Sequence, residues 1–230
     1  PTSNPPSFGI IPLLAGTMLI TLIAISIAGP LGLFAAIYMA EYASPRIRGF
    51  AKPVLEILAG IPTVVLGFFA ALTVAPLIRG WGESFGLSVS SESALAAGVV
   101  MGMMIIPLIS SLADDVINAV PQSLRDGSYA MGATKSETIK KVVLPAALPG
   151  IVSAFILAIS RAIGETAPLV IIGAATFIAT NPDSPVARFT VIPIQIYNWT
   201  KDARPGFGEI SAAAIVLLLI VLLVFNATAI

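Results

Sequence analysis

Two residues of opposite charge, Arg161 and Glu165, stand in an otherwise apolar part of the chain. Their spacing of four would place both side chains on one face of a helix, where they could pair. Charges at membrane depth are costly and usually face a bundle interior or a watery pathway. The planar fork of donors on arginine suits phosphate or sulfate oxygens. We therefore predict that this pair lines the path of an oxyanion. An ion pair that fixes the helix to its neighbour is the open alternative.

Glu56 is the third charged residue within an apolar run, and it is a further candidate for the translocation path. It lies near one end of that run, so a structural role at the membrane surface is the competing interpretation. The segment Leu58-Ala-Gly-Ile-Pro62 follows directly. Its small residues favour close helix packing, and a gating role is the alternative.

The elements that position these charges are predicted to cross a membrane. The 230 residues are 57% hydrophobic and only 10% charged, whereas soluble domains carry roughly 25% charged residues. With 12 basic and 12 acidic side chains the net charge is zero, which is unlike the basic footprint of a nucleic-acid-binding protein. The chain has no histidine and no cysteine. We therefore predict no catalytic residue, no metal site and no cofactor.

Five apolar stretches are long enough to cross a hydrocarbon core of about 30 Å. They cover residues 10–42 with a break at Gly29-Pro30, 53–78, 94–112, 142–163, and 210 to the end. A further apolar run, 169–178, follows the sequence Gly164-Glu-Thr-Ala-Pro168. It could continue the fourth span, re-enter the membrane or lie at its surface. A broken helix at membrane depth is tolerated only beside protein or a watery cavity.

The basic residues of the loops predict the orientation. Loops 44–52 and 114–141 carry seven Lys and Arg, and loops 79–93 and 181–209 carry four. The positive-inside rule places the first pair in the cytoplasm, with residue 1 outside and the C-terminus inside. We interpret residues 1–230 as a single transmembrane domain. Because the sequence begins at Pro1 and stops within an apolar run, we also interpret it as a fragment trimmed at both ends, and residues 1–7 show no signal peptide.

The loop at about 114–145 carries the most specific pattern in the chain. Pro121 suits the start of a short helix, and Gly132 permits a C-cap with positive φ. Thr134 followed by Glu137 predicts a capping box for a second helix, 135–143. Leu144-Pro145 then marks re-entry into the bilayer. The loop should therefore fold as two short helices about a glycine hinge, a rigid knob offered to a cytoplasmic partner.

This loop resembles the EAA motif of ABC-importer permeases. The motif positions are Asp126, Gly127 and Ser128, then Gly132 with Ala133 and Thr134, and finally Leu144 and Pro145. The opening triplet departs from the family pattern, since Asp replaces Glu, and Gly and Ser replace two Ala. The resemblance implies that the loop docks into a cleft of a cytosolic ATPase subunit. It also implies an all-α fold, a polytopic transmembrane helical bundle of the type I ABC importer (MetI-like) kind, with about five core spans and cytoplasmic coupling helices.

Other segments resemble the PstA and PstC permease subunits of the bacterial phosphate importer. These segments are residues 36–45, 58–62, 142–150 and 161–168. Residues 165–169 and 193–199 are more similar to PstA, and 56–69 to PstC. The resemblance implies half of a channel in the bacterial inner membrane, and a role in translocation for Arg161 and Glu165. A second permease subunit, a cytosolic ATPase dimer and a periplasmic phosphate-binding protein would be its partners.

Two alternatives remain open at this point. One is a permease of the same fold for sulfate, molybdate or another solute. The other is a secondary transporter driven by an ion gradient, a class that often shows paired inverted repeats, and none is visible here. The sequence has no Gly-rich phosphate loop ending in Lys-Ser/Thr. The chain itself is therefore not expected to hydrolyse ATP.

Overall fold

The computed structural model describes residues 10–86, 93–172 and 189–228. Residues 1–7, and parts of the run 169–178 and of the loop 181–209, lie outside this description. The described residues form helices joined by short connections. The helices are α1 (Ile11–Ile37), α2 (Pro45–Ala59), α3 (Thr63–Phe69), α4 (Ala75–Ser84), α5 (Ala94–Ala119), α6 (Gln122–Ala130), α7 (Lys135–Thr138), α8 (Leu144–Gly164), α9 (Ala167–Ile171), α10 (Ile192–Lys201) and α11 (Phe207–Ala227).

Three π-helical segments join helices into longer units. They are η1 (Tyr38–Tyr42) after α1, η2 (Ala70–Val74) between α3 and α4, and η3 (Ile139–Val143) between α7 and α8. Among the described residues, five units are long and apolar enough to cross a membrane, as the sequence predicts. They are Ile11–Tyr42, Thr63–Ser84, Ala94–Ala119, Lys135–Gly164 and Phe207–Ala227.

The boundaries differ from the sequence prediction at several places. The first unit runs through Gly29-Pro30 without interruption. The third extends to Ala119 because its polar last turns find partners on other helices. The predicted second span, 53–78, is wrong as a single helix. It is divided at Gly60–Pro62, where the C-cap Gly60 ends α2 and Pro62 precedes α3.

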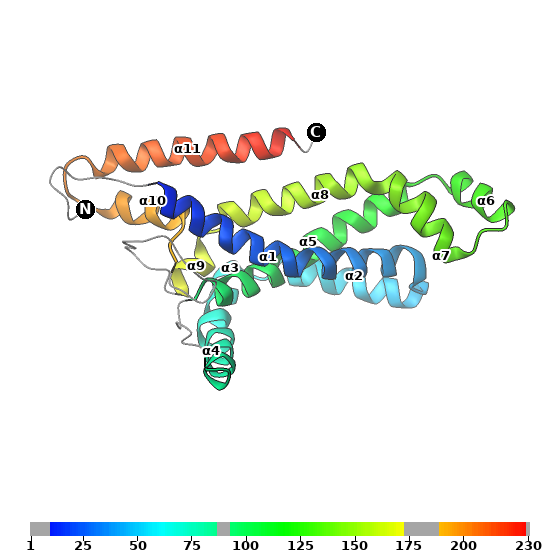
Figure 1. Cartoon of the computed structure of the whole chain (residues 1–230), viewed down its shortest axis with the longest axis horizontal. Helices are drawn as coiled ribbons and strands as arrows, with labels where there is room; N and C mark the ends of the chain where they lie inside the picture. The colour runs from blue at the N-terminus through cyan, green and yellow to red at the C-terminus, as the bar shows by residue number, and fades with distance from the viewer. Residues whose placement is uncertain (1–9, 87–92, 173–188, 229–230) are drawn as a thin grey trace.

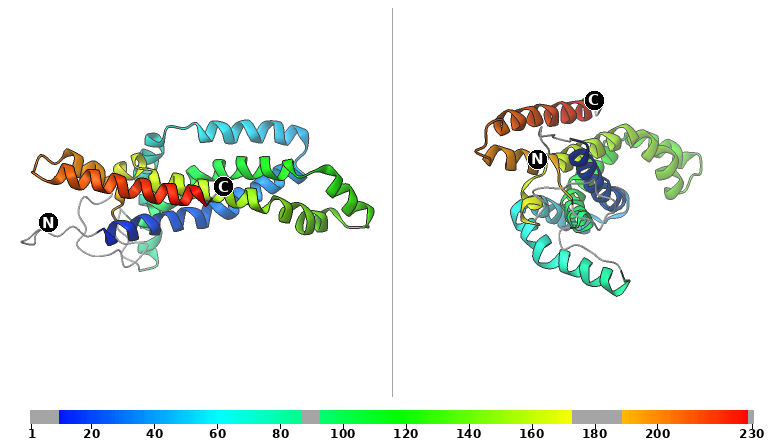
Figure 2. Two further views of the ribbon diagram at one scale, coloured as in Figure 1. Left: turned by 90° about the horizontal axis from the view of Figure 1, so that it is seen from above. Right: turned by 60° about the vertical axis from the view of Figure 1, so that its left-hand side comes forward.

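The core is built on α1 and α5, which lie side by side and run in the same direction (Figures 1 and 2). Glycines allow this close approach. A Cβ added at Gly98 would lie 2.5 Å from Ile23 Cγ2, and one added at Gly32 would lie 2.9 Å from Ile109 Cβ. Helix α8 packs against both α1 and α5. The glycines let the helix backbones approach closely, as is usual between membrane helices.

Because α1 and α5 run in the same direction, the chain must run back between them, and α2 and α3 together form this return segment. Lys52 of α2 contacts Asp115 near the end of α5. Ala70 and Val74 of η2 belong to the same buried cluster as Ala94 at the start of α5. The helices α1, α2, α5, α8 and α11 run along the long axis of the molecule, whereas α4 leaves crosswise to it, and both figures agree on this (Figures 1 and 2).

Gly98→Ala is predicted to destabilise the bundle, with Gly49→Ala as its matched control. Both glycines are helical, so alanine gains a similar helix propensity at each. An added Cβ at Gly98 meets Ile23, whereas nothing lies within 4 Å of one at Gly49. Overpacking typically costs about 1–3 kcal/mol. Thermal unfolding in detergent should therefore shift downward for Gly98→Ala only. An equal shift in both variants would contradict the close α1–α5 contact.

Candidate functional site

The predicted two-helix knob is present at one end of the molecule. Helix α6 ends at a turn in which Gly132 has a φ of +84° and donates its N–H to Tyr129 O. Thr134 and Glu137 then form the predicted capping box of α7. Ser128 and Thr138 join the two helices through a 2.9 Å hydrogen bond between their hydroxyls. Local sequence rules therefore determine the shape of the knob, and this single bond closes it.

The tip of the knob is open to solvent. Asp126 and Gly127 are exposed, Ser128 and Ala133 are half-buried, and a Cβ at Gly127 would meet no atom within 4 Å. Three large apolar side chains are exposed beside them, namely Leu124, Tyr129 and Met131. The small residues Asp126, Gly127 and Ser128 thus lie beside exposed aromatic and methionine side chains, which are enriched in protein–protein interfaces.

The predicted re-entry at Leu144-Pro145 is not a separate boundary. Helix α7 continues through η3 into α8 as one unit of 30 residues, Lys135–Gly164. Pro145 lies in the first turn of α8, directly after the π-helical segment η3, and the unit continues through it although proline has no N–H to donate. The second helix of the knob is therefore the beginning of a span, so a displacement of the knob moves that span directly.

A second attachment of the knob, between Arg125 and Glu41, was not anticipated from the sequence. Arg125 of α6 forms an ion pair with Glu41 in η1 and also donates to Ile117 O of α5 at 2.8 Å. The side chains of Glu41 and Arg125 are only 5% and 11% exposed. Breaking a buried pair leaves an uncompensated charge and costs about 3–5 kcal/mol. This pair therefore fixes the knob to the end of α1.

Lys135 strengthens the same junction from the other helix of the knob. Its ammonium donates to the backbone carbonyl of Glu41 and lies 5.0 Å from the ring centroid of Tyr42. Thus α6 and α7 both hold the π-helical end of α1, and we name Glu41, Tyr42, Arg125 and Lys135 the loop clamp. The sequence gives no sign of the contact between Glu41 and Arg125, because the two residues are 84 positions apart and share no motif.

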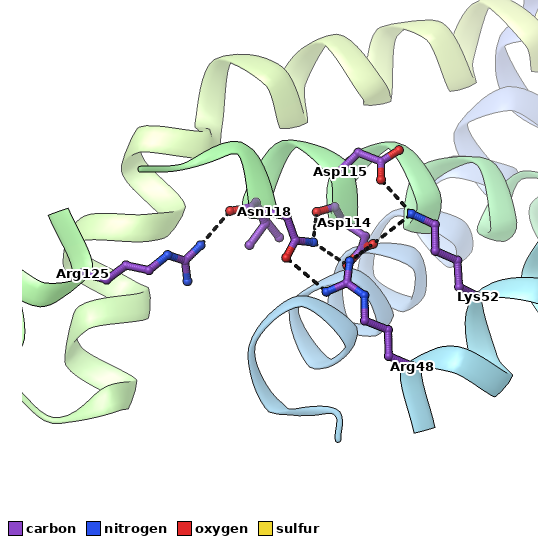
Figure 3. A network of polar contacts seen from close by, with 7 residues as sticks. Arg48, Lys52, Asp114, Asp115, Asn118 and Arg125 are labelled. Atoms are coloured by element: carbon purple, nitrogen blue, oxygen red, sulfur yellow. Dashed lines mark hydrogen bonds and ion pairs between the residues drawn. The ribbon is translucent and has the colours of Figure 1, made fainter. Parts of the chain in front are cut away.

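A network on the neighbouring helices completes this end of the molecule (Figure 3). Asp114 of α5 is buried and accepts from Arg48 of α2 at 2.8 Å. Asn118 accepts from the same arginine at 3.1 Å and donates to Asp114 at 2.9 Å. Lys52 bonds Asp115 at 2.9 Å. These side chains belong to the predicted loops 44–52 and 114–141, but in the structure they join α2 to the last turns of α5.

The opposite end of the bundle carries Arg161 and Glu165. Their predicted pair is present, with Arg161 Nε 3.7 Å from Glu165 Oε1 and side-chain exposures of 42% and 18%. Glu165 has left the helix and is the extended C-cap of α8. The distance exceeds that of a hydrogen bond, so the pair is a loose one. Along the helix axis, Arg161 lies about 30 Å from Lys141, which approaches the thickness of a bilayer core.

The break after α8 packs against the second crossing. Helix α9 follows Glu165 and Thr166 directly and lies against α3, where a Cβ at Gly67 would be only 2.7 Å from Pro168 Cα. The part of the run 169–178 that is described therefore starts as a short separate helix. Glu56 is exposed on α2, one turn beyond Lys52. The structure thus brings Arg161 and Glu165 together and places Glu56 on a separate helix.

The turn that leads into α11 is held by charge. Arg204 donates through its side chain and its backbone N–H to Asp202. These hydrogen bonds lower the pKa of Asp202 to about 2. The carboxylate is therefore ionised at neutral pH and keeps its pairing with Arg204. Gly206, with a φ of +88°, is the N-cap of α11.

Comparison with known proteins identifies the family of this chain. Residues 28–230 match the family described as "Binding-protein-dependent transport system inner membrane component". The chain belongs to this family. It is a multi-pass membrane protein with the fold of type I ABC importer permeases.

Curated relatives cover most of the chain. It is 38% identical over 193 residues to the probable ABC transporter permease protein YqgH of Bacillus subtilis, which covers 84% of this chain and 61% of YqgH. It is 34% identical to the phosphate transport system permease protein PstA 1 of Mycobacterium tuberculosis, covering 93% and 67%. PstC 1 of that species is 31% identical, covering 85% and 62%. The chain thus spans about two thirds or less of the length of these relatives.

Solved structures support the fold. The permease chain of an inward-facing MetNI methionine ABC transporter superposes with a TM-score of 0.65 at 21% identity, covering 96% of this chain and 91% of that chain. A bacterial ABC transporter involved in the import of the acidic polysaccharide alginate also gives 0.65, at 15% identity, covering 97% and 78%. The predicted all-α, MetI-like architecture is confirmed, and the reading of 1–230 as one domain stays a prediction.

Arg125→Ala is predicted to release the loop from the end of α1, because the carboxylate of Glu41 then stays buried without its partner. The loop should become sensitive to trypsin at Lys135 and Lys140 under native conditions, since local opening exposes cleavage sites. Arg46→Ala is the control, because Arg46 is an exposed cation of α2. The exchange Glu41→Arg with Arg125→Glu should restore part of the protection. Equal cleavage of all four proteins would contradict the loop clamp.

Proposed function

We propose that this chain is the transmembrane permease subunit of an ATP-driven phosphate importer in a bacterial inner membrane. It would form half of the translocation path, and a second permease subunit would form the other half. The observation that carries the proposal is the exposed two-helix knob, attached on one side to α8 and on the other to the end of α1. The family of the chain and its similarity to PstA and PstC support the class of transporter and the substrate.

The knob is proposed to dock a cytosolic ATPase dimer. Asp126, Gly127 and Ser128 would contact the ATPase, and the Gly132 turn with its capping box keeps them in place. ATP hydrolysis is assigned to that partner. Movement of the knob would be transmitted to α8 through the continuous helix and to α1 through Arg125 and Glu41.

Phosphate is proposed to meet Arg161 at the outer end of α8. The guanidinium is partly exposed and holds Glu165 only loosely, so its donors can turn to an oxyanion. Glu165 would keep the guanidinium oriented while the path is empty and favour release of the anion. Glu56 would face the path from α2 on the cytoplasmic side. A periplasmic phosphate-binding protein would deliver the anion to the outer face.

Arg161→Gln is predicted to reduce phosphate uptake strongly while the complex still assembles. Charge-assisted hydrogen bonds contribute about 1.5–3 kcal/mol, so the loss should be about 10- to 150-fold. Arg79→Gln is the matched control, because Arg79 is also paired with a glutamate four residues on, at 3.0 Å. The measurement is ATP-dependent uptake of labelled phosphate into vesicles that contain the complete complex.

The outcomes separate the substrate from the role of the arginine. Uptake that excess sulfate does not block, and that only Arg161→Gln loses, supports the proposal. Uptake retained by Arg161→Gln would reduce that residue to a structural role. Transport of sulfate or molybdate in place of phosphate would contradict the proposed substrate and leave the assignment as an ATP-driven importer intact. Uptake that continues without the ATPase would favour a gradient-driven transporter.

Gly127→Leu is predicted to weaken docking of the ATPase without disturbing the fold of the loop. A Cβ at this position meets no described atom within 4 Å, so the leucine side chain would extend from the contact surface. Co-purification of the ATPase should fall at least about tenfold, which corresponds to about 1.4 kcal/mol. Gly80→Leu is the control, since Gly80 is equally open but lies on α4 at the other end. Unchanged co-purification would place the contact elsewhere.

A further inference from the structure

Helix α4 runs in a different direction from the long helices of the bundle. The unit Thr63–Ser84 is long and apolar enough to cross a membrane, yet its second half, α4, runs crosswise to α1, α5, α8 and α11 (Figures 1 and 2). Those four helices belong to the other four units that could cross a membrane, and their common direction therefore gives the membrane normal. A helix crosswise to them lies in the plane of the membrane.

The position of α4 along the normal places it at the outer face. Val74 and Ala75, where α4 begins, are buried in one cluster with Ala94 and Ala96 at the start of α5. The start of α5 is the end remote from the knob, because α6 directly follows the end of α5. With the knob on the cytoplasmic side, α4 lies level with the outer ends of the spans.

The two faces of α4 differ in chemistry. Leu77, Trp81 and Phe85 are spaced by four and form one apolar stripe, with Trp81 69% and Phe85 83% exposed. Arg79 and Glu83 lie two residues out of phase with this stripe, and therefore on the opposite face. They bond each other at 3.0 Å and are both exposed. The apolar stripe has no partner from the described part of this chain that covers it.

We propose that α4 is an interfacial helix that rests in the outer leaflet, with its apolar stripe in the lipid and its ion pair toward water. Amphipathic helices of this kind lie with one face at the boundary of headgroups and acyl chains. Tryptophan is enriched at this depth. The second crossing is therefore completed by α2 and α3, and α4 anchors its outer end to the bilayer.

A lipid surface fits the stripe better than a protein does. A stable protein interface buries about 800 Å² on each partner, and the stripe offers three side chains. An interfacial helix needs only one narrow apolar face. The paired charges on the other face are already satisfied at the surface, so they require water and no partner. The inference uses the orientation of the bundle and is independent of the solute that is transported.

The test uses the absence of cysteine from this sequence. Single cysteines at Trp81→Cys and Glu83→Cys carry a nitroxide label in vesicles that contain the complete complex. Collisions with oxygen, which enters lipid, and with a water-soluble nickel chelate are measured for each label. Leu219→Cys on α11 supplies the reference for a label within a span, and Arg46→Cys, at an exposed position in the first turn of α2 outside the knob, supplies the reference for water.

The label at position 81 should collide mainly with oxygen and lie shallower than the label at 219. The label at 83 should collide mainly with nickel, giving a several-fold difference in the ratio of the two rates. Two labels at the depth of 219 would show that α4 crosses the membrane and overturn the proposal. Two labels in water would overturn it as well.

Two further measurements keep the result decisive. If the label at 81 is shielded from both reagents only when the second subunit is present, a protein partner covers the stripe and the lipid proposal fails. Leu77→Cys repeats the test on the same stripe without removing Trp81, so a folding defect of one variant cannot decide the outcome. Phosphate uptake by each labelled complex is recorded separately, so failure of the proposed substrate is distinguished from failure of this inference.

Discussion

The buried ion pair between Glu41 and Arg125 is the contact on which the knob end of this molecule depends. It joins the last turn of the first span to an arginine that lies 84 residues later in the chain, and both side chains are almost completely buried. A charge in such surroundings persists only when it is paired. The loop cannot leave α1 without exposing a buried charge, so the knob and the end of the first span form one mechanical unit.

The two ends of the bundle are held in different ways. At the end that carries the knob, Arg48 and Lys52 of α2 form hydrogen-bonded ion pairs with Asp114 and Asp115 of α5. At the opposite end, Arg161 and Glu165 are paired more loosely, and α9 begins after a break in the helix. A firm junction suits the transmission of force, and a loose pair suits the exchange of an anion. This contrast follows from distances and burial within one chain.

The π-helical segments lie at the junctions between these regions. Segment η1 presents Glu41, η3 joins the knob to α8, and η2 lies where α4 turns away from the bundle. A π-helical turn rotates the side chains that follow it relative to a regular helix, and such turns occur often at functional sites. Here η2 and η3 each join two helices into one continuous unit, whereas η1 ends the first unit.

The sequence by itself determined the local features of this protein. Apolar length located the five spans, and Gly132, Thr134 and Glu137 fixed the shape of the knob, because a positive φ and a capping box are encoded within a few residues. The pairing of Arg161 with Glu165 was also predicted, but its premise of a shared helix face was wrong, because Glu165 lies beyond the end of α8 in an extended conformation. What only the tertiary structure decided are contacts between distant segments and the directions of helices. Glu41 and Arg125 have ordinary spacing and no shared motif, the division of the second span follows from the packing of α2 and α3, and the crosswise course of α4 depends on the start of α5. Periodicity and propensity describe neighbours along the chain, whereas these features arise from charges and surfaces that meet only after the helices have packed.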